Sequence, residues 1–381
     1  MQRRCPLGKR PAWIPVTSLF LTVFLCVPAL SAPQKGRSVE KRQTIETAVA
    51  GFMSRNSIPG LAAALVLDGK PYWSQGFGMA DLENHSPATS STLFRLGSVS
   101  KPVSATAVLE LWERGELDLD APVQKYCPAF PQKEWPITTR ELLGHLGGIR
   151  HYNPDGKGDI PEDSARHFAS IRQSLELFAS DPLVAKPGTK FHYSTYGYTL
   201  AGCVLEGVAS EKFIDFLRKN VFESAGMHET RDDDFFAVVP HRSRWYHRDN
   251  GGVVENAGPL DSSYKIPGGG MISSADDMAN FEAAILRGKL LKPATRDLMW
   301  TSLKAADGKE TGYGLGWGIM DKFGLHLLAH TGGQQGTSTA IAVVPARNAG
   351  VVVLCNLDSV DVDQLAMQIL RIALEVPENK P

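Results

Sequence analysis

The sequence predicts an α/β (α+β) fold in which an antiparallel sheet is flanked by helices and carries an inserted all-helical subdomain. Two apolar strands, residues 61–67 and 72–79, are joined through Asp68-Gly69, a dipeptide typical of tight hairpins. Further apolar strands gather mainly towards the C-terminal end, and helical patterns fill most of the interval. Because strands must pair to bury their apolar faces, we expect the two ends to share one sheet, with 43% hydrophobic residues supplying its core.

The first 32 residues predict a signal peptide. A basic patch is followed by an apolar run over residues 16–30 and then by the small residues Ser31 and Ala32. This order is typical of a cleaved secretory leader, so the sequence predicts a secreted or periplasmic protein. The alternative is a membrane anchor formed by the uncleaved leader, because the apolar run nearly reaches spanning length.

The remaining chain is predicted to contain a polar linker, residues 33–43, and one main domain, residues 44–381. The domain opens with a helix that carries Ile45, Val49 and Phe52 at helical spacing and stops at Gly60. The hairpin follows, and then a long apolar helix that begins near Ser98. The helical subdomain is expected at about residues 104–228. Its helices are predicted at residues 139–146, 171–178, 196–209 and 212–224. Later strands are predicted at residues 244–246, 325–329, 338–344 and 350–356, before a final helix at residues 362–374.

Composition and cysteine usage exclude several classes of function. The chain has 40 basic and 41 acidic residues, so nothing in its charge indicates binding to nucleic acid. Cys127, Cys203 and Cys355 are odd in number and widely spaced, which predicts neither a disulfide framework nor a zinc site. We interpret Cys203 and Cys355 as small core residues. The run 232–234 of three aspartates lacks the spacing of a calcium loop and is expected to be a solvated loop. No metal or cofactor is predicted.

Ser98 and Lys101 form the candidate catalytic pair. Residues three apart share a helix face, so the lysine amine can reach the serine hydroxyl. A serine becomes a useful nucleophile only when a neighbour takes its proton, and a lysine can do so if burial or nearby positive charge lowers its pKa. Two further Ser-x-x-Lys strings, at residues 38–41 and 262–265, do not open an apolar helix. The context of a strand end, a turn and a helix therefore singles out Ser98.

Three ordered motifs resemble those of the serine β-lactamase and penicillin-binding-protein superfamily. They are Ser98-x-x-Lys101, then Tyr193-Ser194-Thr195, then His330-Thr331-Gly332-Gly333. The chain is most similar to the class C-like branch and, within it, to the animal mitochondrial serine β-lactamase-like proteins, which are filament-forming proteases. The similarity extends from about residue 44 to the C-terminus and implies a β-lactamase/transpeptidase-like fold.

The resemblance implies a role for each motif. Ser98 would attack a carbonyl and become acylated, Lys101 would take its proton, and the Tyr193 phenol would pass a proton to the leaving group. The backbone N–H groups of Ser98 and Gly333 would form the oxyanion hole. A cationic Lys101 is expected to lower the pKa of Tyr193.

Substrate-binding residues are predicted beside the catalytic group: Thr195, His330, Thr331, Gly332 and Tyr152. Thr195 stands where β-lactamases usually have Asn, and His330 where they usually have Lys. A histidine is largely neutral near pH 7, so a fixed cation that would pair with a substrate carboxylate is missing there. Tyr152 follows a glycine pair in a loop that could rim the pocket.

The sequence therefore predicts a cofactor-free serine hydrolase that forms an acyl-enzyme on Ser98 and cleaves amide or ester bonds. It would act as a peptidase, an esterase or a D,D-carboxypeptidase-like enzyme, with weak β-lactamase activity in second place. The alternative is a catalytically weak penicillin-binding protein or a self-assembling scaffold with the same fold. The expected partners are a small-molecule or peptide substrate and, in a homo-oligomer, further copies of the chain.

Overall fold

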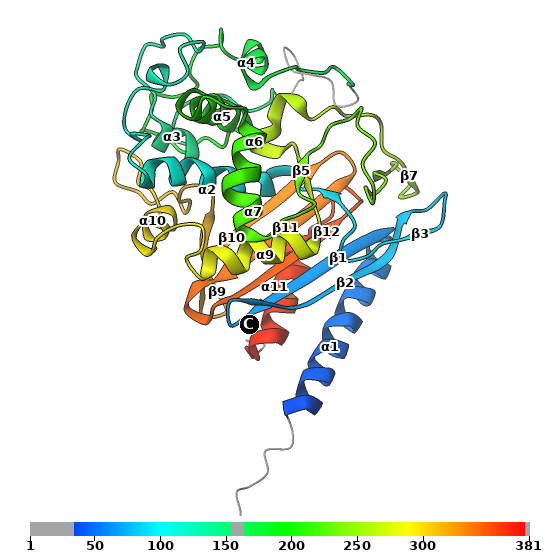
Figure 1. Ribbon diagram of the computed structural model, residues 1–381. Coiled ribbons are helices and arrows are strands. Elements are labelled where there is room, and N and C mark those ends of the chain that lie inside the picture. Colours follow the sequence, from blue (N-terminus) through cyan, green and yellow to red (C-terminus); the bar gives the residue numbers. More distant parts are fainter. Residues whose placement is uncertain (1–33, 154–163, 378–381) are drawn as a thin grey trace, which may run out of the picture. The chain divides into compact units, whose positions relative to one another are not determined.

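The computed structural model describes residues 34–153 and 164–377. Its principal sheet has seven strands in the order β3-β2-β1-β12-β11-β10-β9, and each neighbouring pair is antiparallel (Figure 1). The central pair joins β1 to β12, so both ends of the main domain build one sheet, as the sequence predicts. The strands are β1 (Gly60–Leu67), β2 (Lys70–Asp81), β3 (Ser86–Pro87), β9 (Gly318–Lys322), β10 (Leu325–Gln334), β11 (Thr337–Val344) and β12 (Ala349–Cys355).

Both faces of this sheet are buried, and β1 shows how the sequence divides between them. Leu61, Ala63 and Leu65 pack with helices α1 (Gln34–Arg55) and α11 (Val362–Leu374). The alternate residues, such as Ala62 and Ala64, join the larger core on the opposite face, where helix α9 (Ala275–Leu286) lies. Successive side chains of a strand point to opposite faces, so a strand buried on both sides is apolar throughout.

The chain between β4 and β5 is mainly helical in its described part, in agreement with the predicted insertion. Strands β4 (Phe94–Arg95), β8 (Met271–Ser273) and β5 (Arg231–Asp232) form a small sheet in the order β4-β8-β5, and β6 (Tyr246–Arg248) pairs with β7 (Val254–Asn256). The remaining α-helices are α2 (Ser100–Glu113), α3 (Thr139–Leu143), α4 (Ile171–Ser174), α5 (Thr195–Ala209), α6 (Phe213–Leu217), α7 (Glu223–Ala225), α8 (Ile266–Gly269) and α10 (Pro293–Met299).

The predicted linker is wrong. Helix α1 begins at Gln34, so the polar residues 34–43 belong to its first turns. Lysine, arginine, glutamate and glutamine are good helix formers, and polarity alone does not prevent a helix. The predicted leader, residues 1–32, lies outside the described residues. Within the described ranges, no helix has both the length and the apolar character that crossing a membrane requires.

The interpretation of the cysteines needs one correction. Cys127 and Cys203 form a disulfide; their Cα atoms are 5.6 Å apart, and the two residues are 76 positions apart in the sequence. The bond ties helix α5 to the loop that precedes α3. Cys355 is a free, buried thiol in β12, as predicted for a core residue. Wide spacing hid the pair, because only the packing of α5 brings the two cysteines together.

The aspartate run at residues 232–234 is not wholly solvated. Asp233 is 2% exposed, and its carboxylate accepts a hydrogen bond of 2.7 Å from Nε of the fully buried Arg95. The Arg95 guanidinium also donates to the carbonyl oxygens of Leu260 and Gln335 and lies 3.5 Å from the ring centre of Trp245. Arg95 therefore holds three separate segments around the strand that leads to Ser98.

Candidate active site

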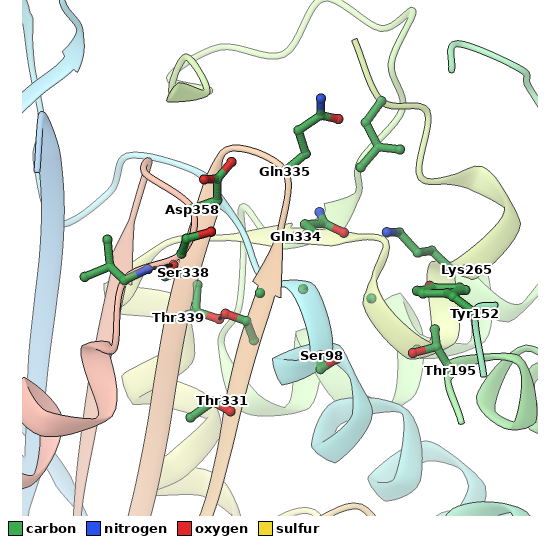
Figure 2. A pocket seen from close by; sticks show the side chains of 18 of the residues that line it. Ser98, Tyr152, Thr195, Lys265, Thr331, Gln334, Gln335, Ser338, Thr339 and Asp358 are labelled. Atoms are coloured by element: carbon green, nitrogen blue, oxygen red, sulfur yellow. Dashed lines mark hydrogen bonds between the residues drawn. The ribbon is translucent and has the colours of Figure 1, made fainter. Parts of the chain in front are cut away.

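Ser98 lies in a tight turn at the edge of a cavity. The turn is a short 3₁₀ helix, Gly97–Val99, that runs from β4 into α2, so the regular helix begins at Ser100 and slightly later than predicted. Gly97 has a φ of +52°, a left-handed conformation that disfavours side chains. The cavity has a volume of about 980 Å³, and Ser98 and the backbone of β10 both line it (Figure 2). The sequence thus places the hydroxyl at a partly buried bend beside the sheet, where it lines the cavity.

Lys101 lies beneath this hydroxyl on α2. Its side chain is fully buried, and its Nζ lies 2.9 Å from Ser98 Oγ, 3.2 Å from Thr195 Oγ1 and 2.6 Å from the Gly268 carbonyl oxygen. Burial, reinforced by the positive charge of Lys265, holds the pKa of Lys101 well below its ordinary value. No acidic group supplies an ion pair to Lys101 among the described residues. Burial therefore favours the neutral form of the amine.

Tyr193 faces the same pair from the residues before α5. The Lys101 Nζ lies 4.7 Å from the centre of the Tyr193 ring, and the phenol is hydrogen-bonded to Ser98. Burial raises the pKa of Tyr193 well above its ordinary value, and the bond to Ser98 opposes this only in part. The expected lowering of the pKa of Tyr193 by Lys101 is therefore wrong. Desolvation of the phenol therefore outweighs the stabilisation of the phenolate by its surroundings.

The predicted oxyanion donors are brought together by two close backbone approaches. A Cβ built on Gly97 would lie 3.0 Å from the Gly333 nitrogen, and one built on Gly332 would lie 3.0 Å from the Ser98 nitrogen and 2.1 Å from the Leu96 carbonyl oxygen. Only glycine allows β10 to lie this near the Ser98 turn. The N–H groups of Ser98 and Gly333 thus come from segments in direct contact.

Of the predicted substrate-binding residues, four line the cavity: Tyr152, Thr195, Thr331 and Gly332. Thr195 is the first residue of α5, where the Ser194 hydroxyl caps the helix by accepting a hydrogen bond of 2.9 Å from the Gly197 N–H. The Tyr152 ring stacks on His151, with ring centres 4.2 Å apart. Burial raises the pKa of Tyr152 well above its ordinary value, so its hydroxyl stays protonated.

His330 is the exception, because its side chain lies behind the cavity. The imidazole is 8% exposed and is missing from the described residues that line the cavity. Its Nδ1 lies 2.7 Å from the Thr331 carbonyl oxygen, which can only accept, so Nδ1 carries the proton and Nε2 accepts from the Tyr313 hydroxyl at 2.9 Å. Burial lowers the pKa of His330 to about 3. His330 is therefore a buried, neutral group bonded to Tyr313, and its role in substrate binding stays a prediction.

Sequence reasoning left two polar side chains of the cavity wall out of the predicted site. Lys265 precedes α8, and Gln334 ends β10; both line the cavity (Figure 2). The Ser-x-x-Lys string at residues 262–265 drew attention to Lys265, but its lack of a following helix argued against a role. The glycine run after Lys265 indicates from the sequence that Tyr264 and Lys265 could face the site, and the structure places Lys265 in the cavity wall.

Comparison with known proteins decides the family. The family profile described as Beta-lactamase matches residues 45–374. This chain belongs to the β-lactamase family. Its relatives include the bovine serine beta-lactamase-like protein LACTB, mitochondrial, to which it is 31% identical over 430 residues that cover 84% of this chain and 77% of the relative.

One bacterial relative and one archaeal structure agree with this assignment. Penicillin-binding protein 4* of Bacillus subtilis is 25% identical and covers 78% of this chain and 68% of its own. The solved structure described as the octameric penicillin-binding protein homologue from Pyrococcus abyssi superposes with a TM-score of 0.75 at 27% identity, over 88% of this chain and 77% of that one. The β-lactamase/transpeptidase-like fold predicted from the sequence is confirmed.

Proposed function

We propose that the protein is a serine hydrolase that cleaves amide or ester bonds through an acyl-enzyme on Ser98. One observation carries the proposal: a buried amine with a lowered pKa lies 2.9 Å from a hydroxyl that opens onto a large cavity. A neutral lysine has two N–H bonds and one lone pair. Since the Gly268 carbonyl and the Thr195 hydroxyl can accept the two N–H bonds, the lone pair is left to face the Ser98 hydroxyl.

The reaction then follows from the positions of these groups. Lys101 Nζ takes the Ser98 proton while Oγ attacks the substrate carbonyl carbon, and the negative charge that develops on the carbonyl oxygen is stabilised by the Ser98 and Gly333 N–H groups. When the intermediate collapses, the leaving group receives a proton from the Tyr193 phenol, and the Lys101 ammonium returns one to Tyr193. A water molecule then attacks the acyl carbon, which releases the acid and restores Ser98.

The geometry favours amide and ester substrates over β-lactams. A cation at position 330 would pair with the carboxylate of a β-lactam or a terminal D-amino acid, but His330 is neutral, buried and bonded to Tyr313. Without that pairing, we expect penicillins to bind and acylate slowly. The relatives whose names describe penicillin-binding proteins support binding of penicillins by this chain as well.

The experiment is intact mass spectrometry of the protein over time with an activated ester, a D-Ala-D-Ala peptide and a penicillin. We expect an adduct on Ser98 that appears and decays with the ester or peptide. Ser98→Ala should abolish the adduct, whereas Ser91→Ala, which changes an exposed serine, should label like the parent protein. An adduct that survives Ser98→Ala would refute the assignment. An adduct that forms and never decays would favour a penicillin-binding protein over a hydrolase.

The disulfide supports a location in an oxidising compartment. Disulfides persist in secreted and periplasmic proteins and are rare where thiols are kept reduced, so the Cys127–Cys203 bond agrees with the predicted leader. The names of the LACTB relatives place those proteins in mitochondria, which makes an organelle the competing address. Mass spectrometry of the native protein with and without reductant tests the bond.

Self-assembly is a second proposal, supported by the archaeal relative whose description names an octamer. Light scattering across a range of protein concentrations would test it, and a monomer at every concentration would refute it.

A further inference from the structure

Lys265 is a buried cation without a counter-ion. Its side chain is 5% exposed, and its ammonium lies 5.2 Å and 5.8 Å from the ring centres of Tyr264 and Tyr152. Among the described residues, no acidic group lies within ion-pair distance of it and no side-chain or backbone oxygen accepts a hydrogen bond from it. Buried charges are normally paired, so an ammonium that lines a cavity with three unused N–H donors indicates a missing acceptor.

This ammonium is close to the reacting groups. The Lys265 side chain passes over Gly269, where an added Cβ would lie 3.8 Å from its Cδ and 3.6 Å from the Gly97 carbonyl carbon. Its charge contributes to the lowered pKa of Lys101. Lys265 therefore lies on the wall beside Ser98 and not at the outer rim.

Gln334 approaches the cavity from β10. Both polar atoms of its carboxamide are buried, and neither has a hydrogen-bond partner in the described part of the chain. Figure 2 shows the carboxamide of Gln334 directed towards the side of the pocket that carries Lys265. Arg95 fixes the two walls relative to each other, because it donates to the carbonyl of Leu260 on the Lys265 side and to that of Gln335 next to Gln334.

The direction of β10 indicates which end of the cavity holds the leaving group of the substrate and which end holds its acyl part. The leaving group must lie near its proton donor, Tyr193, whose ring centre is 6.3 Å from that of His330, the residue before Thr331. The leaving group therefore lies at the Thr331 end of the strand. The acyl part of the substrate extends past the Gly333 N–H towards Gln334 and Lys265.

We infer that Lys265 and Gln334 form a subsite for a carboxylate carried on the acyl part of the substrate. The inference rests on the proposed hydrolase function and names the class of acyl group. Lys265 supplies the positive charge and Gln334 the amide N–H donors, which together match the two oxygens of a carboxylate. The acidic residues that line the cavity, Asp358, Asp361 and Asp363, come from the first turn of α11 and the segment before it, and they would repel a carboxylate placed beside them. In this protein the group that recognises an anion is therefore not the residue at position 330, where His330 is neutral, but Lys265 on another part of the cavity wall.

The test compares two p-nitrophenyl esters of equal length, one of adipic acid with its free carboxylate and one of adipamic acid with a neutral carboxamide. For the parent protein we expect kcat/KM to be at least about tenfold higher for the charged ester, as one desolvated ion pair allows. Lys265→Met should bring the ratio of the two kcat/KM values to about one, and Lys265→Arg should keep a preference for the charged ester. Lys289→Met, the same change at an exposed lysine, should leave the ratio unchanged.

Two results would overturn the subsite. One is an unchanged ratio in Lys265→Met. The other is an equal loss of activity on both esters, which would mean that Lys265 acts only through Lys101.

A binding measurement separates this inference from the proposed function. In Ser98→Ala, which cannot be acylated, calorimetry should show tighter binding of the charged ester, and adding Lys265→Met should remove the difference. Preferential binding without any turnover by the parent protein would support the subsite and refute the hydrolase. Equal or undetectable binding of the two esters would refute the subsite, whatever Ser98 does with other acyl compounds.

Discussion

Lys101 and Glu282 are both fully buried ionisable side chains, but their surroundings give them different properties. At the candidate active site, Lys101 is fully buried but has three oxygen atoms within hydrogen-bond distance of its Nζ. Between α9 and the sheet, Glu282 is also fully buried, yet neither carboxyl oxygen has a partner in the described structure. Burial moves the pKa of each group towards the neutral form, downwards for the lysine and upwards for the glutamate.

The difference lies in what the neutral form can do. A neutral Lys101 has acceptors for its N–H bonds and a hydroxyl beside its lone pair, so desolvation prepares a base. A neutral Glu282 has no hydrogen-bond partner among the described residues, and the structure only accommodates its volume. A Cβ on Gly350 would lie 2.4 Å from Glu282 Oε2, so the glycine in β12 leaves room for the carboxyl group. A shifted pKa therefore indicates a functional site only where suitable partners and an open cavity accompany it.

The largest expected effect comes from removing the buried amine. Lys101→Met should slow acylation of Ser98 by about 10³-fold or more, because the hydroxyl loses its proton acceptor. The folded protein should survive, since an apolar chain of similar length fills the site. Stopped-flow measurement of acylation checks the rate, and thermal unfolding checks the fold. Full activity in Lys101→Met would assign the base elsewhere, and Lys289→Met serves as the control at an exposed position.

The next largest effect is expected from the buried ion pair between Arg95 and Asp233. Asp233→Asn should lower the free energy of unfolding by about 3–5 kcal/mol, because the Arg95 guanidinium stays buried without its counter-ion. Denaturant unfolding checks this value. Asp120→Asn, which removes the partner of the more exposed Arg140, should cost less than about 1 kcal/mol. Equal losses in the two variants would show that burial adds nothing to the Arg95–Asp233 pair.

Glu282 should give the smallest effect, and one of opposite sign. Glu282→Met removes an unsatisfied polar group and should raise the free energy of unfolding by about 1–3 kcal/mol. The pKa of Glu282 is raised in the folded protein, so its contribution is fully present below the ordinary value of 4.5 and is lost as the pH rises through and above it. Stability of the parent protein should therefore fall relative to Glu282→Gln as the pH rises from 4.5 to 8, since glutamine does not titrate.

Denaturant unfolding of the parent and both variants at several pH values measures these differences. A constant difference between the parent and Glu282→Gln across this range would show that Glu282 is solvated or paired in the folded protein.

Short-range patterns determined a large part of what the sequence predicts. The hairpin, the final helix and the Ser98–Lys101 pair depend on residues a few positions apart, whose spacing the backbone geometry fixes. Successive side chains of β1 contact the cores on opposite faces of the sheet, because side chains alternate along a strand with a period of two residues. The order of the three motifs also predicted the family, because three motifs in a fixed order are far more specific than a single Ser-x-x-Lys string.

Only the tertiary structure decided the properties that depend on burial and on contacts between distant segments. It paired Cys127 with Cys203, buried Asp233 against Arg95, turned His330 away from the cavity and turned Lys265 into it. It also reversed the expected shift of the Tyr193 pKa. A sequence shows which groups can ionise, but the surroundings that determine the free-energy cost of a charge come from residues far away in the chain, such as Asp233 for Arg95.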